Sequence, residues 1–422
     1  MRHRQGLSTV RRTGRPRAME PTLLLIGWDW ASTSHAVTVL DAAGAIVGCW
    51  TVGHTEHDLK TLLARLAAYD DPAALPVAIE RAEGLVVDRL IAAGHPVVPV
   101  DPGAFHAARP RWGAAGAKSD PGDSYKLADY LRTDGHRLRR LEPVDAATRE
   151  LQSLVRLRDD HVAARTAASN QLGALLDAHW PGAKQVFFRL ASKIALAFLA
   201  EFPTPQAAAQ LDEHQLAAFC RRHAYRGGRR PAELLKRLQS APTPAVGLDP
   251  TVLARLVDAQ TQLLATLLAT IADLDQAITT RLATHPKAHL LARLPRVGHI
   301  SHAQLLAELG PILDRASSAE HAAAEAGATP VTRASGKTSS VHFRLAANRR
   351  ARQALHVFAD NARHGSPWAA KLYADARARG KRHPQAVRVL GRAWLRIIWA
   401  CWHTNTPYDP ARHRAEQRLA AA

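Results

Sequence analysis

A chain of 422 residues with 56 Lys and Arg against 37 Asp and Glu carries a formal net charge of +19, and 47% of its residues are hydrophobic. This length allows two or three domains, and this hydrophobic content can fill their cores. The basic excess favours a polyanionic partner such as nucleic acid, because neutralising phosphates releases their counterions; a membrane surface would also attract it.

The composition argues against several other classes of protein. The three cysteines, Cys49, Cys220 and Cys401, are far apart, which argues against a disulfide framework and a cysteine zinc site. No apolar run approaches the ~20 residues that cross a bilayer. Residues 1–20 are basic but lack the apolar core of a secretory signal. We therefore expect a disordered basic tail at residues 1–20 and a cytoplasmic, nucleoid-associated protein.

The first predicted strand is the apolar run from Leu23 to Ile26, which continues through Gly27 and Trp28 to Asp29. Such a run is typical of a strand buried on both faces. A carboxylate buried at its end costs several kcal/mol unless it is paired or binds a cation. Asp29 is therefore either structural or part of a metal site.

Further strands and helices follow in an ordered series. Alternating residues at 35–40 and 45–52 flank Asp41-Ala42-Ala43-Gly44, which predicts two strands joined by a hairpin. The pattern then predicts a helix over 54–68, a strand over 75–80 that ends in Glu80, a helix over 84–93 and a strand over 96–102. This βββαβαβ order matches a ribonuclease-H-like core, which we expect over residues 21–144.

Two more carboxylates stand where the next helix is expected. If that helix begins at about Pro121, Asp120 is its N-cap and Asp123 lies in its first turn. Like charges ~4 Å apart repel by about 4 kcal/mol at an effective dielectric of about 20, so Asp29, Glu80, Asp120 and Asp123 could share one site only around divalent cations. Oxygen ligands favour Mg²⁺ or Mn²⁺, and two such ions would clamp a scissile phosphate. Separate structural roles, with Glu80 bound to an arginine, remain the alternative.

Long helical patterns dominate the chain from residue 145 onward. Those beginning at about 145 and covering 250–284 predict an antiparallel coiled coil within 145–290, with a helical insert of unknown role at about 190–250. In residues 291–408, Pro295 and Gly298 form a turn before a helix, where backbone N–H groups can meet a phosphate. Ser301 and Gln304 have the spacing of a capping box. A polar loop over 327–338, a basic helix and a tail at 409–422 complete the expected order.

Ser335 stands beside Gly336 and between Arg333 and Lys337. A serine flanked by cations could attack a phosphate while Arg and Lys hold the non-bridging oxygens. Its activation would have to come from a metal, because no His or Asp partner can be named. An ordinary loop serine explains the same spacing, and Ser339 and Ser340 are close competitors.

Two histidine pairs have helical spacing, His285 with His289 and His299 with His302. No cysteine or carboxylate completes a zinc set around them. We expect these histidines at the surface or in contact with phosphate.

Several segments together resemble one known family: Gly27-Trp28-Asp29, Ala78-Ile79-Glu80, Lys118 to Asp123, Leu294 to Gly298, Gly327 to Pro330, and Ser335-Gly336. They are similar to the DEDD transposases of insertion sequences, the family numbered one hundred and ten, which are bridge-RNA-guided recombinases. The resemblance covers about residues 22–405. Arg296 stands where a Gly is common, and Ala328 stands where the loop often has Leu.

The resemblance implies a RuvC-like domain, a coiled-coil region and a mostly helical C-terminal transposase domain. By matching, Asp29, Glu80, Asp120 and Asp123 would bind Mg²⁺, and Ser335 would attack DNA to form a covalent phosphoserine. A non-coding bridge RNA would pair with donor and target DNA, and the protein would act as a homo-oligomer.

The residues expected to contact nucleic acid flank these two groups. They are Arg109, Arg111, Lys118, Lys126, Gly298, Arg333, Lys337, Arg344, Arg349 and Arg350. Two other readings stay open: a hydrolytic RuvC-like junction nuclease in which water attacks, and a non-catalytic RNA-binding protein whose acids are structural.

Overall fold

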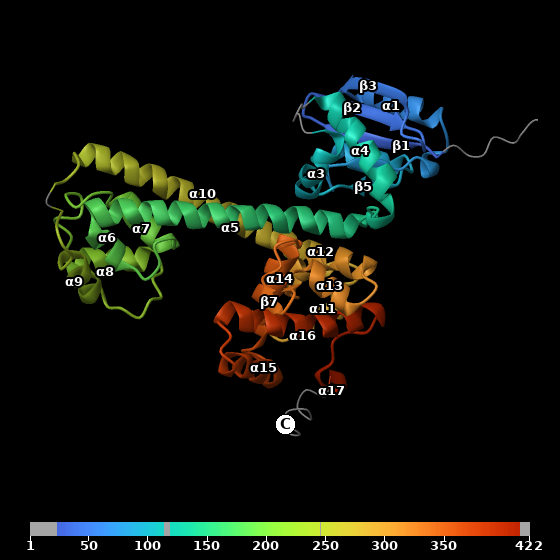
Figure 1. Ribbon diagram of the computed structural model, residues 1–422. Coiled ribbons are helices and arrows are strands. Elements are labelled where there is room, and N and C mark those ends of the chain that lie inside the picture. Colours follow the sequence, from blue (N-terminus) through green and yellow to red (C-terminus); the bar gives the residue numbers. More distant parts are fainter. Residues whose placement is uncertain (1–22, 114–118, 245, 414–422) are drawn as a thin grey trace, which may run out of the picture. The chain divides into compact units, whose positions relative to one another are not determined.

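The computed structural model describes residues 23–113, 119–244 and 246–413 (Figure 1). The described residues form two compact units, which divide between Pro143 and Val144. The predicted tail at residues 1–20 lies outside the described residues, and so do Lys118 and most of the predicted tail at 409–422.

The first unit is built on a five-stranded sheet in the order β3-β2-β1-β4-β5. β1 pairs antiparallel with β2 and parallel with β4, and β2 pairs antiparallel with β3. The predicted strands are thus confirmed. Their bounds are β1 (Leu25–Trp30), β2 (Ser34–Leu40), β3 (Ile46–Gly53), β4 (Val77–Ile79) and β5 (Val97–Pro99).

Helices cover both faces of this sheet, because alternate strand residues form two separate cores. Trp28 and Ile79 belong to the core under the helices α1 and α2, whereas Leu25 packs with Leu127 and Leu131 of α4 in the other. The helical elements of this unit are α1 (Glu56–Ala67), η1 (Pro72–Ala74), α2 (Leu85–Ala92), α3 (Pro102–Ala108), η2 (Arg109–Trp112), α4 (Asp120–Asp134) and η3 (Gly135–Arg137).

The second unit contains two long antiparallel helices, α5 (Ala146–His179) and α10 (Pro250–Ala283) (Figure 1). Near one end of the pair, Thr148 Oγ1 lies 3.0 Å from His285 Nε2 just beyond α10. Near the other end, Leu176 and Leu253 share one core. The two predicted long helices are confirmed, and a coiled coil remains a prediction.

One property of α10 differs from expectation. The helix is long and apolar enough to cross a membrane by length and composition, with a mean hydropathy of 1.2 in its most apolar window. No uninterrupted apolar run of that length is present, but the average hydropathy of this helix reaches the level of a membrane span. A single such helix is weak evidence for a membrane span, and here Leu253, Val257 and Leu264 are buried in the core of the unit.

The insert between the long helices is helical, as predicted, and packs its aromatic residues together. The rings of Phe187, Phe198 and Phe219 lie with centroids 5.7–6.4 Å apart. These rings join the ends of α5 and α10 in one apolar cluster. The helices of the insert are α6 (Pro181–Val186), α7 (Lys193–Glu201), α8 (Glu213–Arg222) and α9 (Pro231–Gln239).

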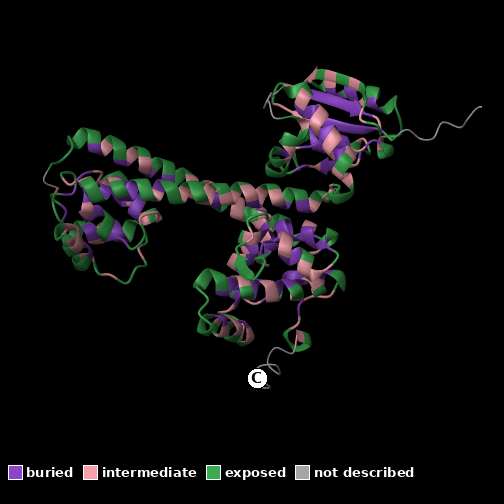
Figure 2. Ribbon diagram, viewed as in Figure 1, coloured by how far each residue is buried: buried purple, intermediate pink, exposed green. Residues whose placement is uncertain are grey.

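The last part of the chain packs α12, α14 and α16 around a separate apolar cluster, in which Phe358 and Trp394 are fully buried. Figure 2 shows the buried and exposed faces of these helices. The elements are α11 (Ala288–Leu291), α12 (His299–Arg315), α13 (Ala319–Glu325), β6 (Val331–Ser335), β7 (Thr338–His342), α14 (Arg349–Ala362), α15 (Pro367–Ala378), α16 (His383–His403) and α17 (Pro410–His413).

Two predictions for this region are wrong. The expected polar loop is largely a β-hairpin, in which β6 and β7 pair antiparallel from Val331↔His342 to Ser335↔Thr338. The expected capping box also fails, because Gly298 is the N-cap of α12, so that Ser301 lies within the helix. The partner of Gln304 is instead Asp159 on α5, to which its amide donates at 2.8 Å.

Candidate active site

The strand register places Asp29 and Glu80 on neighbouring strands. Trp28 of β1 pairs with Ile79 of β4 in parallel register, and Asp29 and Glu80 each follow that pair. Because Trp28 is buried in the core under α1 and α2, the alternation of the strand directs Asp29 to the opposite face. That face is the one covered by α4.

The helix α4 lies against β1 at Gly27, where it touches the strand backbone. A methyl group on Gly27 would lie 2.0 Å from the Ser124 carbonyl oxygen and 2.4 Å from the Ala128 nitrogen. Farther back along β1, Leu25 packs with Leu127 and Leu131. The helix therefore runs opposite to β1, so its first turn lies toward the end of the strand that carries Asp29.

That first turn contains Asp120 and Asp123 in different surroundings. Ser119 is the N-cap, with its hydroxyl accepting from the Gly122 N–H, so the prediction that Asp120 caps the helix is wrong. Asp120 is exposed, but the Asp123 side chain is only 5% exposed. Its carboxylate receives Arg109 Nη2 at 2.9 Å and Lys126 Nζ at 3.0 Å. These two cations compensate the buried charge within the protein.

The fit of a metal to these acids has two parts. Carboxylates are the donors that Mg²⁺ and Mn²⁺ prefer, and the backbone brings Asp29, Glu80 and the first turn of α4 to one face and one end of the sheet. Within residues 23–113, 119–244 and 246–413, however, no three His, Cys, Asp or Glu side chains are grouped as metal ligands. The donor types and backbone positions fit a divalent ion, and side-chain rotations would have to complete its ligand set.

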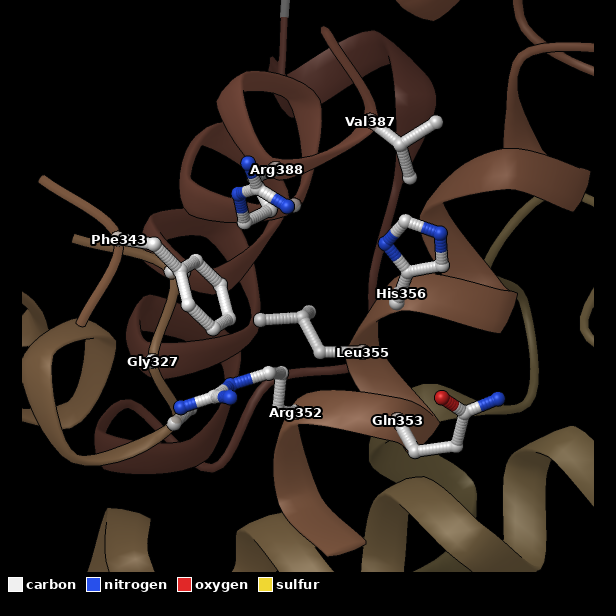
Figure 3. A pocket seen from close by; sticks show the side chains of 11 residues that line it. Gly327, Phe343, Arg352, Gln353, Leu355, His356, Val387 and Arg388 are labelled. Atoms are coloured by element: carbon white, nitrogen blue, oxygen red, sulfur yellow. The ribbon is translucent and has the colours of Figure 1, made fainter. Parts of the chain in front are cut away.

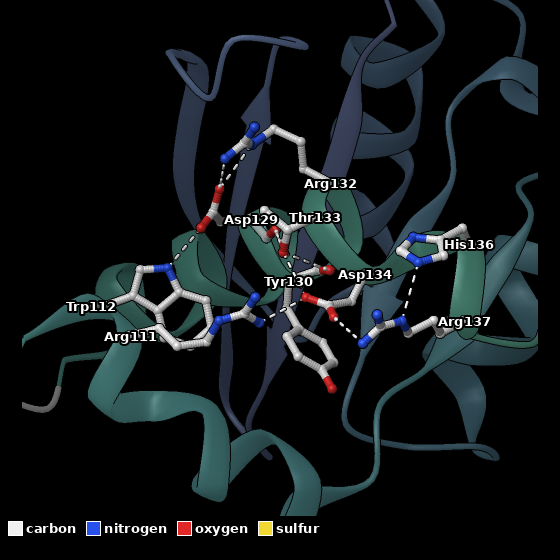
Figure 4. Close-up of polar contacts among 9 residues, drawn as sticks. All are labelled: Arg111, Trp112, Asp129, Tyr130, Arg132, Thr133, Asp134, His136 and Arg137. Carbon is white, nitrogen blue, oxygen red and sulfur yellow. Dashed lines mark hydrogen bonds and ion pairs between the residues drawn. The ribbon is translucent and has the colours of Figure 1, made fainter.

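The basic residues near α4 are tied to the protein itself (Figure 4). Arg111 Nη1 lies 2.7 Å from Asp134 Oδ2, and Trp112 Nε1 donates to Asp129 Oδ2 at 2.7 Å. The hydrogen bond with Asp134 raises the pKa of Arg111, and the same bond lowers the pKa of Asp134. Arg109, Arg111 and Lys126, predicted as phosphate contacts, thus each bind a carboxylate of this unit. Sequence spacing could not reveal these pairs.

Ser335 is the last residue of β6, at the tip of the hairpin. It pairs with Thr338 across a turn in which Gly336 has a φ of 55°, a conformation that favours glycine. The Thr338 hydroxyl donates to the Ser335 carbonyl at 2.8 Å. Every residue from Thr332 to His342 is exposed, including Arg333 and Lys337. The hairpin therefore presents Ser335 and two cations to solvent.

The competing serines lie on β7. Ser339 pairs with Ala334, and Ser340 pairs with Arg333. The Ser340 hydroxyl lies 2.8 Å from Nε2 of His342, which is not among the candidate residues predicted from the sequence. Ser340 and His342 are two residues apart, so on a strand their side chains lie on the same face. A predicted strand at this place would therefore have predicted their contact.

The other predicted phosphate contacts differ in their surroundings. The N–H of Gly298 donates to the Arg296 carbonyl at 3.1 Å, so it is already used. Arg344 Nε donates to the Thr329 carbonyl at 3.0 Å, and Arg350 pairs with Asp160 of α5 at 3.4 Å. Arg344 therefore supports the base of the hairpin.

Two of the four histidines in the helical pairs are buried. His285 lies in contact with Thr148, and His302 is only 6% exposed. Burial lowers the pKa of His302 to about 4. The expectation that His285 and His302 lie at the surface is wrong, whereas His289 and His299 are not buried.

Comparison with known proteins decides the family. Residues 26–181 match a family model described as a transposase, and residues 288–374 match one described as the transposase IS116/IS110/IS902 family. The putative transposase of the IS117 mini-circle of Streptomyces coelicolor is 32% identical over 411 residues, covering 94% of this chain and 98% of that protein. The chain belongs to the IS110 family of transposases.

Other relatives of this transposase are similar over nearly their whole length. An uncharacterized 42 kDa protein of insertion element IS900 from Mycobacterium paratuberculosis is 29% identical, covering 91% of this chain and 97% of that protein. An uncharacterized 43.6 kDa protein of insertion element IS110 from Streptomyces coelicolor is 29% identical, covering 94% and 98%. The protein is thus a DNA transposase with a DEDD-type N-terminal domain.

Proposed function

We propose that this transposase cuts and rejoins DNA through a covalent phosphoserine at Ser335, at sites chosen by a bridge RNA. The observation that carries the proposal is the hairpin tip, which holds an exposed Ser335 between the cations Arg333 and Lys337 in a chain of this family. The Ser335 oxygen forms a bond to phosphorus while the bond to the 3′ or 5′ oxygen of the cleaved strand breaks. The two cations stabilise the charge that develops on the phosphate oxygens.

Asp29, Glu80, Asp120 and Asp123 are the proposed ligands of Mg²⁺ or Mn²⁺. The strand order β3-β2-β1-β4-β5, with β1 parallel to β4, supports a RuvC-like assignment of the first unit. A divalent ion, when bound, neutralises phosphate charge and favours the alkoxide form of an attacking hydroxyl. Asp123 takes part only when Arg109 or Lys126 yields a carboxylate oxygen.

The acids and the serine belong to different compact units of the chain. A complete site therefore needs the two units to meet, within one protomer or between protomers. We propose a homo-oligomer that assembles the site in trans and works in the cytoplasm at the nucleoid. The net charge of +19 supports DNA and RNA as partners.

Ser340 is the second candidate nucleophile. Its hydroxyl lies 2.8 Å from His342 Nε2, which could accept the proton that a serine loses on attack. Ser335 lies at the exposed tip of the hairpin, where a DNA strand can reach it. Ser340 lies on β7 and has His342 beside it as a base.

Trapping on nicked suicide DNA decides between these serines and the other readings. Ser335→Ala is expected to abolish the covalent protein–DNA adduct, whereas Ser340→Ala and Ser339→Ala retain it. An adduct that persists in Ser335→Ala and disappears in Ser340→Ala assigns the nucleophile to Ser340. Free cut ends without an adduct indicate a hydrolytic nuclease, and binding without cleavage indicates a non-catalytic RNA-binding protein.

Mixing two inactive variants tests assembly in trans. Asp29→Ala lacks one proposed metal ligand, and Ser335→Ala lacks the proposed nucleophile. If the site forms between protomers, the mixture regains recombination, and DNA attaches only to the subunit that carries Ser335. No recovery, with both variants still assembling, assigns the site to one protomer.

A further inference from the structure

A cavity of about 160 Å³ lies at the root of the hairpin that carries Ser335 (Figure 3). Phe343, the residue after β7, forms one wall. Arg352 and His356 of α14 and Arg388 of α16 form others, and Leu355 lies between them. The cavity thus combines apolar surface with three basic side chains.

Two of these side chains stack on the same aromatic ring. The guanidinium carbon of Arg352 lies 4.5 Å from the centre of the Phe343 ring, and that of Arg388 lies 4.8 Å from it. Figure 3 shows the ring between the two guanidinium groups. Cation–π contacts at these distances fix the direction of each guanidinium, but they do not neutralise its charge.

No carboxylate among the described residues forms an ion pair with Arg352 or Arg388. The acids on the neighbouring helix α13 are held elsewhere, because Glu320 pairs with Arg392 and Arg396, and Glu325 pairs with Arg315. Arg109, Arg111 and Arg132 around α4 each pair with a carboxylate. Arg352 and Arg388 are partly buried without such a partner among the described residues.

The donors of Arg352 are only partly used. Its Nη2 donates to the Arg344 carbonyl at 2.8 Å, but its Nε is buried without a hydrogen-bond partner. Burial lowers the pKa of Arg352 and of Arg388, and the repulsion from Arg349 and from Arg352, respectively, adds to that effect. Partly buried cations with unused donors are stabilised by an anion.

We propose that this cavity, which we call the root pocket, binds one backbone phosphate of the DNA strand that is cleaved at the hairpin tip. The assignment of the strand rests on the proposed role of Ser335. The volume of the root pocket is well below the roughly 300–1,000 Å³ of sites for drug-sized ligands. The root pocket therefore accepts a phosphate with part of a sugar. Arg352 and Arg388 would contact the phosphate oxygens, and Leu355 would contact the sugar.

The length of the hairpin predicts which phosphate is bound. Ser335 pairs at the tip and Val331 at the root, four residues apart along β6. At ~3.3 Å per residue this separation is about 13 Å. A strand of duplex DNA rises ~3.4 Å per nucleotide along the axis and also winds about a tenth of a turn around it. Successive phosphates are therefore farther apart in space than the rise alone, and a straight separation of about 13 Å places the bound phosphate about two nucleotides from the cleaved bond. The root pocket would thus determine which phosphate of the DNA strand lies at Ser335.

A scan with methylphosphonates, each of which removes the charge of one phosphate, tests the position. The protein is the full-length Ser335→Ala variant with its guide RNA, so that DNA binding is measured without DNA cleavage. The DNA is a duplex that contains the end of the element. We expect one neutral linkage about two nucleotides from the cleaved bond to weaken binding roughly tenfold. If neutralising each linkage from about one to about three nucleotides from that bond leaves binding unchanged, the proposal is overturned.

The same scan with a protein that carries both Ser335→Ala and Arg388→Gln tests whether Arg388 contacts the sensitive phosphate. This protein should bind the unmodified duplex roughly tenfold more weakly and lose nothing further at the sensitive linkage, because the charge partner is already absent. Arg255→Gln removes an exposed charge from α10 and should leave the full sensitivity at that linkage. If each neutral linkage weakens binding equally in the proteins with and without Arg388, the proposal is overturned.

Methylphosphonates placed in the guide RNA form the last arm. If Arg388→Gln removes the sensitivity to a neutral linkage only in the guide RNA, the root pocket binds RNA and the assignment to DNA is wrong. Because every arm measures binding by a protein without Ser335, the result is independent of the covalent adduct. Failure of the adduct on suicide DNA would contradict the proposed function while leaving the coupling measurable.

Discussion

Gly27 on β1 and Ser124 on α4 are in direct contact through their backbones, with no room for a side chain on Gly27. A methyl group there would lie 2.0 Å from the Ser124 carbonyl oxygen. On the same helix, the Ser124 hydroxyl lies 2.7 Å from Thr38 Oγ1 on β2. These contacts fix α4 on the sheet, and with it the first turn that carries Asp120 and Asp123.

Gly27→Ala is therefore expected to displace α4. Because the clash is with backbone atoms, the helix must move, and overpacking of this kind costs about 1–3 kcal/mol or more of unfolding free energy. Thermal unfolding and DNA cleavage measure the two consequences. Gly228→Ala is the matched control, because a methyl group at this exposed glycine meets nothing within 4 Å, and it should leave the Tm unchanged. An unchanged Tm and unchanged cleavage in Gly27→Ala would contradict the contact.

Magnesium should stabilise the first unit if the four acids bind it. A ligand at a concentration of ~100 Kd adds about 2.7 kcal/mol to the unfolding free energy. We expect Mg²⁺ to raise the Tm of the native protein and to have little effect on Asp29→Asn. Glu142→Gln, a change at an exposed carboxylate, should keep the full Mg²⁺ response. A response that is equal in Asp29→Asn and the native protein would exclude Asp29 as a ligand.

The buried His302 makes the second unit sensitive to acid. Burial lowers its folded-state pKa from 6.5 to about 4, so the unfolded chain binds a proton first as the pH falls. The contribution of the neutral imidazole is fully present above pH ~6.5 and is lost progressively toward pH ~4. By about pH 5 the loss is of order 2 kcal/mol.

His302→Gln, which stays neutral, should remove that part of the pH dependence. Urea unfolding at about pH 7 and about pH 5 measures it. His364→Gln, a change at an exposed position, serves as the control. A pH dependence that is the same in His302→Gln and the native protein would show that His302 is not buried in its neutral form.

Arg333 and Arg344 are both expected phosphate contacts from the sequence, but they differ in their surroundings. Arg333 is exposed on β6, whereas Arg344 donates to the Thr329 carbonyl at 3.0 Å. Arg333→Gln should leave the Tm unchanged and reduce the slope of log K against log salt for DNA binding by about 1. Arg344→Gln should lower the Tm, because it removes a hydrogen bond at the base of the hairpin. The reverse pattern would place the phosphate contact at Arg344.

The sequence by itself determined the elements whose signal is local. Alternation and apolar runs gave the five strands, and the leucine spacing gave both long helices, because side-chain periods of 2.0 and 3.6 follow from backbone geometry. The positions of Asp29 at the end of β1 and of Glu80 after β4 followed from the same patterns.

Only the tertiary structure decided which cations are free and which histidines are buried. Arg109 and Asp123 are separated by 14 residues, and Thr148 and His285 by 137, so no local period relates them. Their contacts depend on how helices pack, and that packing satisfies charges and buried polar groups that the sequence leaves open. The hairpin under Ser335 belongs here too, because its exposed strands lack the apolar alternation by which a strand is recognised.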